Sequence, residues 1–225
     1  MLVPFWAHSA GTLIALGADR IYMTRFGTLS PIDPSVTNEF NPHDPASPDD
    51  RIPIAVEDVL AFFQLASEQG GDDDGLAGDA FRRLAESVHP LALGNVKRNI
   101  EQIWQLAKKL IRLHRPDLDE AALTALVRRL TTELYSHSHL ITRAEATALG
   151  LPVEQPAQQL EDRLLAYYEQ LKIDLDLLEK FDPGAIQQAQ PVTLERAYIE
   201  TPTTCDTFVT RATPEATSER WETIA

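Results

Sequence analysis

Two short apolar runs and a small-residue segment open the chain. Leu2–Ala7 has the length and composition of a buried strand, and residues 10–19 predict a tightly packed helix. Ile21–Met23 forms the second apolar run, and the region closes in Ser-Pro-Ile-Asp-Pro at residues 30–34. This order predicts a strand–helix–strand unit with Ser9 at its first junction.

Most of the remaining chain shows apolar residues at helical spacing. The stripes predict helices over residues 54–68, 76–88 and 92–113, and another that follows a capping box made by Asp117 and Glu120. The Pro-rich residues 38–53 predict a loop, because proline interrupts both helices and central strands.

The last third of the chain differs from the part before it. A narrow apolar stripe over residues 157–181 predicts a long amphipathic helix, suited to packing on the core or on a neighbouring subunit. After Gln190 the chain is rich in Thr, Glu and Pro, which predicts a polar, disordered tail. We therefore divide the chain into a folded domain over 1–155, a helix within 156–190 and a tail over 191–225.

Composition narrows the classes of function. The chain has 225 residues, of which 44% are hydrophobic, and a net charge of −14, which argues against binding to nucleic acid or to anionic membranes. The single cysteine, Cys205, excludes an internal disulfide. The first residues lack a basic region, and no stretch has membrane-spanning length without charges. We expect a cytoplasmic protein.

Ser9 is the residue with the clearest chemical potential. At a strand-to-helix junction its hydroxyl would lie beside unpaired backbone amides, and the amide of Ala10 would receive the oxyanion formed when the hydroxyl attacks a carbonyl. The alternative is an ordinary N-cap, a position that serine favours. The spacing also departs from the G-x-S-x-G motif of α/β-hydrolases, because Ala7 replaces the first glycine.

Four segments of the chain resemble the serine dehydrogenase proteinase family and occur in the same order. They are HSAGTLIALGADRIYM, GTLSPIDP, HPLALGNVKR and SHSHLITRAEATALGLPV. That family is related to signal peptide peptidases of the Ser-Lys type and to the Clp protease subunit. The resemblance covers about residues 2–153. It implies a Clp/crotonase-like α/β fold with a helix-rich C-terminal half, and hydrolysis of peptide bonds through an acyl-enzyme on Ser9. It also implies a peptide or protein substrate, a homo-oligomer, and no metal or other cofactor.

The general base is less apparent. Where the Clp protease subunit has a histidine, the S-P-I-D-P element offers Asp33, which is a poor base unless its pKa is raised. Signal peptide peptidases of this fold use a lysine, which makes Lys97 the first candidate; His43 and His89 are lower ones. His137 and His139 alternate, as metal ligands on a strand sometimes do, but without a third ligand nearby we expect a structural or surface role.

Two other classes remain open: a non-catalytic oligomeric scaffold of the same fold, and a crotonase-type acyl-CoA enzyme. The family resemblance further implies strand–helix units before Leu2, which would supply a second oxyanion donor. We therefore expect a truncated chain whose activity is impaired or absent, in which residues 2–7 form an exposed edge. Membrane association would arise only through such a missing N-terminal segment.

Overall fold

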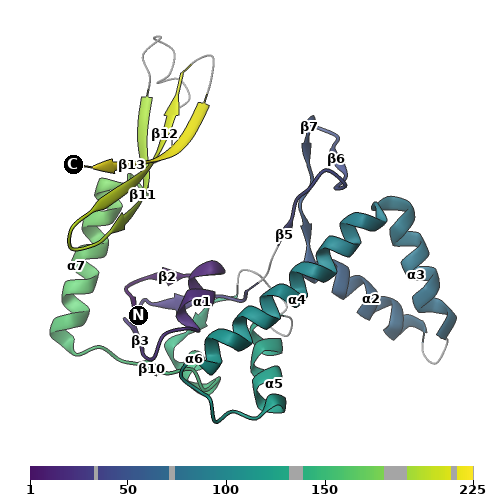
Figure 1. Ribbon diagram of the computed structural model, residues 1–225, viewed down its shortest axis with the longest axis horizontal. Coiled ribbons are helices and arrows are strands. Elements are labelled where there is room, and N and C mark those ends of the chain that lie inside the picture. The colour runs from purple at the N-terminus through teal and green to yellow at the C-terminus, as the bar shows by residue number, and fades with distance from the viewer. Residues whose placement is uncertain (33–34, 71–73, 132–138, 180–191, 214–216, 225) are drawn as a thin grey trace. The chain divides into compact units, whose positions relative to one another are not determined.

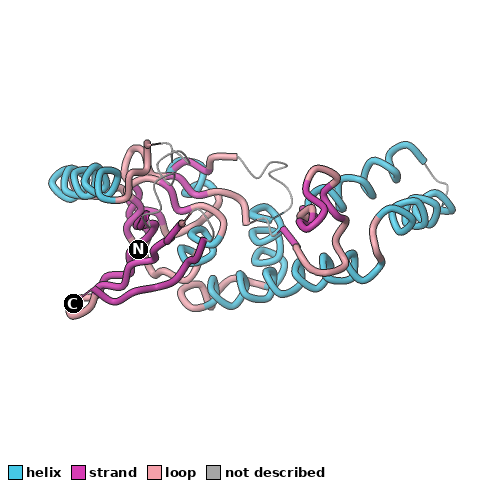
Figure 2. Tube along the Cα trace, turned by 90° about the horizontal axis from the view of Figure 1, so that it is seen from above, coloured by secondary structure: helices cyan, strands magenta, loops and turns pink. Residues whose placement is uncertain are grey.

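The computed structural model describes residues 1–32, 35–70, 74–131, 139–179, 192–213 and 217–224 (Figure 1). The chain divides into two compact units, Met1–Pro156 and Ala157–Ala225. The boundary lies next to the predicted end of the first domain at residue 155. The fold is mixed α/β, with several small sheets and longer helices (Figure 2).

Two three-stranded sheets form the β-structure at the start of the first unit. One has the order β1-β3-β10 with all neighbours parallel, and the other has the order β2-β4-β9 with β2 parallel and β9 antiparallel to β4. Their strands are β1 (Leu2–Val3), β3 (Ile21–Met23), β10 (Val153–Glu154), β2 (Trp6–Ala7), β4 (Thr28–Leu29) and β9 (Ile141–Thr142).

The single strand predicted over residues 2–7 is thus divided between two sheets. Val3 and Ala7 are buried, whereas Leu2 and Trp6 are 49% and 64% exposed, so only one side of each strand faces the core. Both β1 and β2 lie at the edge of their described sheets, which is the edge position that the sequence predicts.

A hydrophobic core joins these strands to three helices: α1 (Ala10–Ala15), α4 (Pro90–Arg112) and α5 (Glu120–Thr131). Leu16 lies just after α1, Ile111 on α4 and Leu130 on α5, and all three are almost fully buried. The predicted stripe of α5 and the second half of that of α4 therefore face this core. In the first half of α4, Val96 packs instead in a second cluster with Val56. Behind α1, Leu110 approaches the backbone so closely that a Cβ on Gly17 would lie 3.0 Å from its Cδ2.

The start of α5 corrects the predicted capping box. Asp119, rather than Asp117, caps the helix, since its Oδ1 accepts from the amide of Ala122 at 2.7 Å. The Glu120 carboxylate accepts from Lys108 at 2.6 Å and from Arg112 at 2.7 Å, both on α4. Two cations of the neighbouring helix attract Glu120 away from the backbone, a tertiary contact that sequence spacing does not show.

The remaining elements of the first unit are short hairpins and three helices. Residues of the predicted loop form the pair β6–β7, and β5 pairs with β8. The elements are β5 (Ser35–Val36), β6 (His43–Asp44), β7 (Ser47–Arg51), β8 (Ile54–Ala55), α2 (Val56–Gly70), α3 (Asp74–Ser87) and α6 (Arg143–Ala148). Helices α2 and α3 pack together through rings, with Phe63 stacked on Phe81.

The second unit contains α7 (Gln158–Asp174) and three antiparallel strands in the order β11-β12-β13. The strands are β11 (Val192–Glu200), β12 (Cys205–Ala212) and β13 (Thr217–Ile224). The sequence predicts little fixed structure here; the structure instead has a sheet, in which Val209 and Thr210 of the central strand are buried. Threonine and valine favour such a half-buried pleated surface.

None of the helices in the described residues is both long enough and apolar enough to cross a membrane.

Candidate active site

Ser9 occupies a sharp turn between β2 and α1. Its backbone has φ 49° and ψ −107°, a conformation that costs a non-glycine residue about 1–3 kcal/mol. An N-cap residue normally has extended backbone angles and accepts an amide hydrogen bond through its side chain. Ser9 has the wrong backbone for this role, and its hydroxyl makes no capping hydrogen bond. The capping interpretation of Ser9 therefore fails on geometry.

Buried polar groups hold the strained turn in place. The amide of Ser9 donates to Ser30 Oγ at 2.8 Å, and the amide of Gly11 donates to the carbonyl of His8 at 2.7 Å. The Thr12 hydroxyl, fully buried, donates to the carbonyl of Ala7 at 2.8 Å and accepts from the amide of Ser30 at 3.0 Å. These bonds tie the residues on both sides of Ser9 to Ser30, the residue that follows β4. Surroundings that hold a strained residue in this way are typical of functional sites.

The amide of Ala10 differs from the amides on either side of it. Those of Ser9 and Gly11 have acceptors, whereas within the described part of the chain no acceptor faces the amide of Ala10. Ala10 is also exposed. The geometry leaves this one N–H, next to the Ser9 hydroxyl, available for an oxyanion.

His8 precedes Ser9 but its ring lies over an earlier part of the strand. The ring stacks on Trp6 with centroids 5.2 Å apart, and its Nε2 lies 2.9 Å from Thr28 Oγ1. Trp6 and Thr28 are paired in the sheet, and Trp6 lies three residues before Ser9. The His8 ring is therefore directed back along β2 and away from the start of α1.

Helical spacing places Lys97 at the border of the apolar stripe of α4, but in the structure it lies on the exposed side of that helix. Its side chain is 71% exposed, and its ammonium forms an ion pair with Glu101 at 3.0 Å. A lysine acts as a base when burial lowers the stability of its charged form, and such burial is not found here. The structure does not bring Lys97 into contact with Ser9 among the described residues.

The other candidate bases of the sequence lie elsewhere. His43 is an exposed residue of β6, and His89 is the N-cap of α4, where its Nδ1 accepts from the amide of Leu91 at 3.2 Å. Asp33 and His137 lie outside the described residues.

The structure brings together two side chains whose contact the sequence did not predict. His139 Nε2 lies 2.9 Å from Glu145 Oε1 and 3.1 Å from Oε2, so the imidazole is held by a carboxylate of α6. The only signal in the sequence is the T-x-x-E capping pattern of Thr142 and Glu145, in which the carboxylate is expected to bond the backbone.

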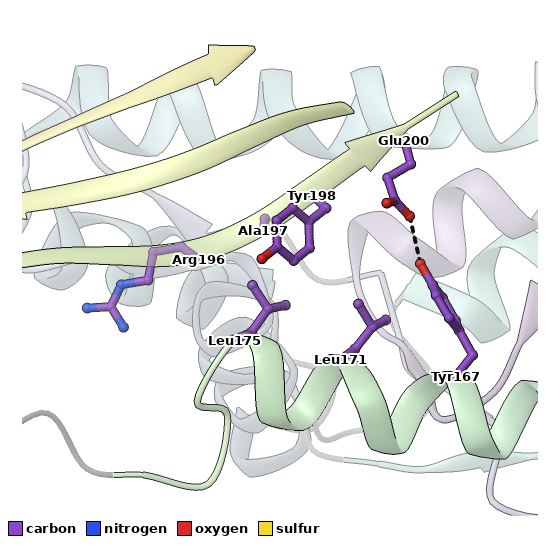
Figure 3. Close-up of a pocket in the computed structure, with 7 residues that line it drawn as sticks. All are labelled: Tyr167, Leu171, Leu175, Arg196, Ala197, Tyr198 and Glu200. Carbon is purple, nitrogen blue, oxygen red and sulfur yellow. Dashed lines mark hydrogen bonds between the residues drawn. The ribbon is translucent and has the colours of Figure 1, made fainter. Parts of the chain in front are cut away.

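No group of three or more His, Cys, Asp or Glu side chains gathers as a metal site in the described ranges. The second unit has an open hollow of about 470 Å³ between α7 and β11 (Figure 3). Its tyrosines are both engaged: Tyr167 donates to Glu200 at 2.8 Å, and the hydrogen bond from Tyr198 to Glu195 raises the pKa of Tyr198 to about 12. Deprotonation of Tyr198 is thereby disfavoured.

Comparison with known proteins gives one distant relative and no assignment. An uncharacterized protein of Methanocaldococcus jannaschii, MJ0137, is 27% identical over 170 residues, which cover 76% of this chain and 48% of the relative. The chain thus spans about half the length of the curated relative it matches. No family model and no solved structure matches the chain.

Proposed function

We propose that this chain is a serine hydrolase of the Clp/crotonase-like type that cleaves peptide bonds through an acyl-enzyme on Ser9. The observation that carries the proposal is the backbone of Ser9, which has φ 49° and ψ −107° and whose hydroxyl makes no capping bond. A strained strand-to-helix turn that presents a serine hydroxyl is also the geometry of the nucleophile elbow of α/β-hydrolases, although Ala7 replaces the first glycine of that motif here.

The proposed chemistry uses the groups around this turn. The Ser9 hydroxyl attacks the substrate carbonyl, and the amide of Ala10 donates a hydrogen bond to the oxygen as it becomes negative. As the intermediate collapses, the C–N bond breaks and the amine leaves with the proton from the Ser9 hydroxyl, which gives an ester on Ser9. Water then hydrolyses this ester, which releases the carboxylic acid and restores the serine hydroxyl. The resemblance of HSAGT and SPIDP to the serine dehydrogenase proteinase family supports a peptide as the substrate and a homo-oligomer as the assembly.

The test is hydrolysis of a quenched-fluorescent peptide library by the chain and by Ser9→Ala. We expect activity in the wild type and a loss of at least about 1,000-fold in Ser9→Ala, because a nucleophile cannot be replaced by a methyl group. Ser35→Ala, which changes an exposed serine of β5, is the matched control and should retain full activity.

Two results would overturn the proposal. Turnover that persists in a clean preparation of Ser9→Ala would remove Ser9 as the nucleophile. If the wild type cleaves no peptide but binds acyl-CoA thioesters, a crotonase-type reaction replaces peptide hydrolysis; if it does neither, the chain is a scaffold.

A further inference from the structure

The hollow of the second unit has walls from one helix and one strand (Figure 3). Tyr167, Leu171 and Leu175 follow one another at four-residue steps, so they lie along one side of α7 and its C-cap. Tyr198 and Glu200 line the hollow from β11. The hollow therefore combines two leucines with two phenol rings, and its volume of about 470 Å³ is in the range of small-ligand sites.

A β-bulge redirects the charged side chain that precedes these strand residues. The pairing of β11 with β12 skips Arg196 between Glu195 and Ala197, so Arg196 is the extra residue of the bulge. Its Nε donates to Thr210 Oγ1 at 3.4 Å, and Figure 3 shows its guanidinium extending away from the two tyrosines. The cation among the lining residues is thus directed away from the phenol rings.

Each phenol ring has a carboxylate fixed beside it. The Tyr167 hydroxyl donates to Glu200 at 2.8 Å, and the Tyr198 hydroxyl donates to Glu195. A carboxylate has about four acceptor positions, so one hydrogen bond from a phenol leaves room for a further donor. The two hydroxyls therefore position negative charge next to the rings that line the hollow.

The electrostatic potential at the rings is negative. The pKa of Tyr167 is raised by its hydrogen bond to Glu200, and then by burial and by nearby charges that include Asp174 of α7. Asp174 also adds to the rise in the pKa of Tyr198, which comes first from the hydrogen bond to Glu195. The potential that disfavours a phenolate favours a cation at the same place.

Helix α7 already holds one cation with these two kinds of group. The ammonium of Lys172 lies 5.6 Å from the centroid of the Tyr168 ring and 2.6 Å from Glu169 Oε2. An ammonium is attracted by the face of an aromatic ring, and a carboxylate adds an ion pair. The hollow offers phenol rings and a carboxylate as well, but none of the described residues that line it is a lysine.

We propose that the hollow between α7 and β11 is a binding site for an alkylammonium ion. The charged end of the ligand lies against the phenol rings and Glu200, and its alkyl chain packs on Leu171 and Leu175. A free amine and the side chain of a lysine share this chemistry. The site belongs to the second unit and does not depend on the reaction proposed for Ser9.

Two other roles for the hollow make different predictions. If the bond between Tyr167 and Glu200 serves only to hold α7 against β11, changes at these residues alter the thermal midpoint and leave the affinity for every probe alike. If Arg196 governs the hollow, an anion binds more tightly than a cation of the same length.

The experiment is a ligand-observed NMR titration of the full chain with hexylammonium, 1-hexanol and hexanoate, which have chains of equal length. Hexylammonium should bind saturably and at least about fivefold more tightly than 1-hexanol, because an ammonium over an exposed ring gains about two- to fivefold and the carboxylates add to this. Hexanoate should bind more weakly than 1-hexanol. N-acetyl-lysine methylamide separates the two sources: tighter binding than hexylammonium supports a lysine side chain as the ligand, and weaker binding supports a free amine.

Two variants of the hollow have matched controls on α7. Tyr167→Leu removes a ring and Glu200→Gln removes a charge, and each should weaken hexylammonium by about two- to fivefold while 1-hexanol binds as before. Tyr168→Leu makes the same replacement as Tyr167→Leu at a residue that does not line the hollow. Asp162→Asn likewise removes one charge from α7 outside the lining. Both controls should bind hexylammonium like the wild type.

Several results would overturn the cation site. Equal affinities for hexylammonium and 1-hexanol would do so, as would tighter binding of hexanoate. A loss in Asp162→Asn as large as that in Glu200→Gln would reduce the binding to general attraction by a chain of net charge −14. Unchanged affinity in Glu200→Gln would remove the carboxylate from the site; because glutamine still accepts from Tyr167, this variant remains informative if Tyr167→Leu does not fold.

Discussion

Two strand-to-helix junctions of the same sheet place a hydroxyl residue before a helix of six residues, yet they differ in geometry. At the β9–α6 junction, Thr142 has φ −70° and ψ 165°, and its Oγ1 accepts from the amide of Glu145 at 3.3 Å. At the β2–α1 junction, Ser9 has φ 49° and ψ −107°, and its hydroxyl makes no capping bond. Thr142 is an ordinary N-cap, whereas Ser9 is not.

The difference teaches that the surroundings, rather than the residue type, decide what a hydroxyl does at such a junction. Thr142 stabilises its helix through its own side chain. At Ser9 the buried hydroxyls of Ser30 and Thr12 bond the neighbouring backbone and hold the turn in a strained form. The Ser9 junction costs stability and gives its hydroxyl no capping bond, an arrangement that the proposed function would explain.

Removing the hydrogen bond from the Ser9 amide to Ser30 should let the strained turn relax, so that the Ser9 junction becomes more like the Thr142 junction. In Ser30→Ala the amide of Ser9 loses its acceptor, which costs about 1–3 kcal/mol for a buried unpaired donor. The turn then relaxes, and a displacement of this kind can lower the rate by about 100-fold. Chemical denaturation and peptide hydrolysis measure the two effects; normal activity in Ser30→Ala would show that the hydrogen bond does not position Ser9.

Gly27 affects both junctions at once, because it precedes β4, the central strand of their sheet. A Cβ at this position would lie 2.7 Å from the carbonyl oxygen of Val3. Since backbone must move to accept it, Gly27→Ala should lower the free energy of unfolding by about 1–3 kcal/mol. A thermal midpoint equal to that of the wild type would show that the backbone around Gly27 can accommodate a methyl group without loss of stability.

The stability effects at the two junctions should have different signs. Thr142→Ala removes a cap and should cost about 1 kcal/mol. Ser9→Gly removes no cap and relieves a positive φ, so the free energy of unfolding should stay unchanged or rise by about 1 kcal/mol. Urea denaturation of both variants measures the contrast, which disappears if Ser9→Gly is destabilised as much as Thr142→Ala.

The smallest effect concerns the α4–α5 pair that packs behind both junctions. Hydrogen bonds from Lys108 and then Arg112 lower the pKa of Glu120 in the folded chain. Its ionised form therefore stabilises the fold above the ordinary carboxyl pKa, and this contribution is lost as pH falls through the lowered pKa. Glu120 is exposed, so the effect is small. The thermal midpoint of Glu120→Gln should fall less on acidification than that of the wild type; parallel curves would exclude this linkage.

Local patterns predict those parts of the molecule that depend on local contacts. The apolar stripe of α4 is enough to predict that helix. In the same way, the small residues after Ser9 are enough to predict a strand-to-helix junction. The sheet of the second unit was not predicted, because its alternating residues are mixed with Thr and Glu and gain their burial only by pairing. Likewise, the His139–Glu145 contact and the capture of Glu120 by α4 depend on tertiary packing, which spacing along the chain does not show.

The most direct test of the account is to locate the residue that a fluorophosphonate modifies in the wild-type chain. After reaction to completion, digestion and mass spectrometry of the peptides identify the site. We expect a single adduct on Ser9, because its hydroxyl makes no capping hydrogen bond and the adjacent amide of Ala10 has no acceptor among the described residues. No adduct, or an adduct on another serine in place of Ser9, would contradict the claim that the strained turn exists to present a nucleophile.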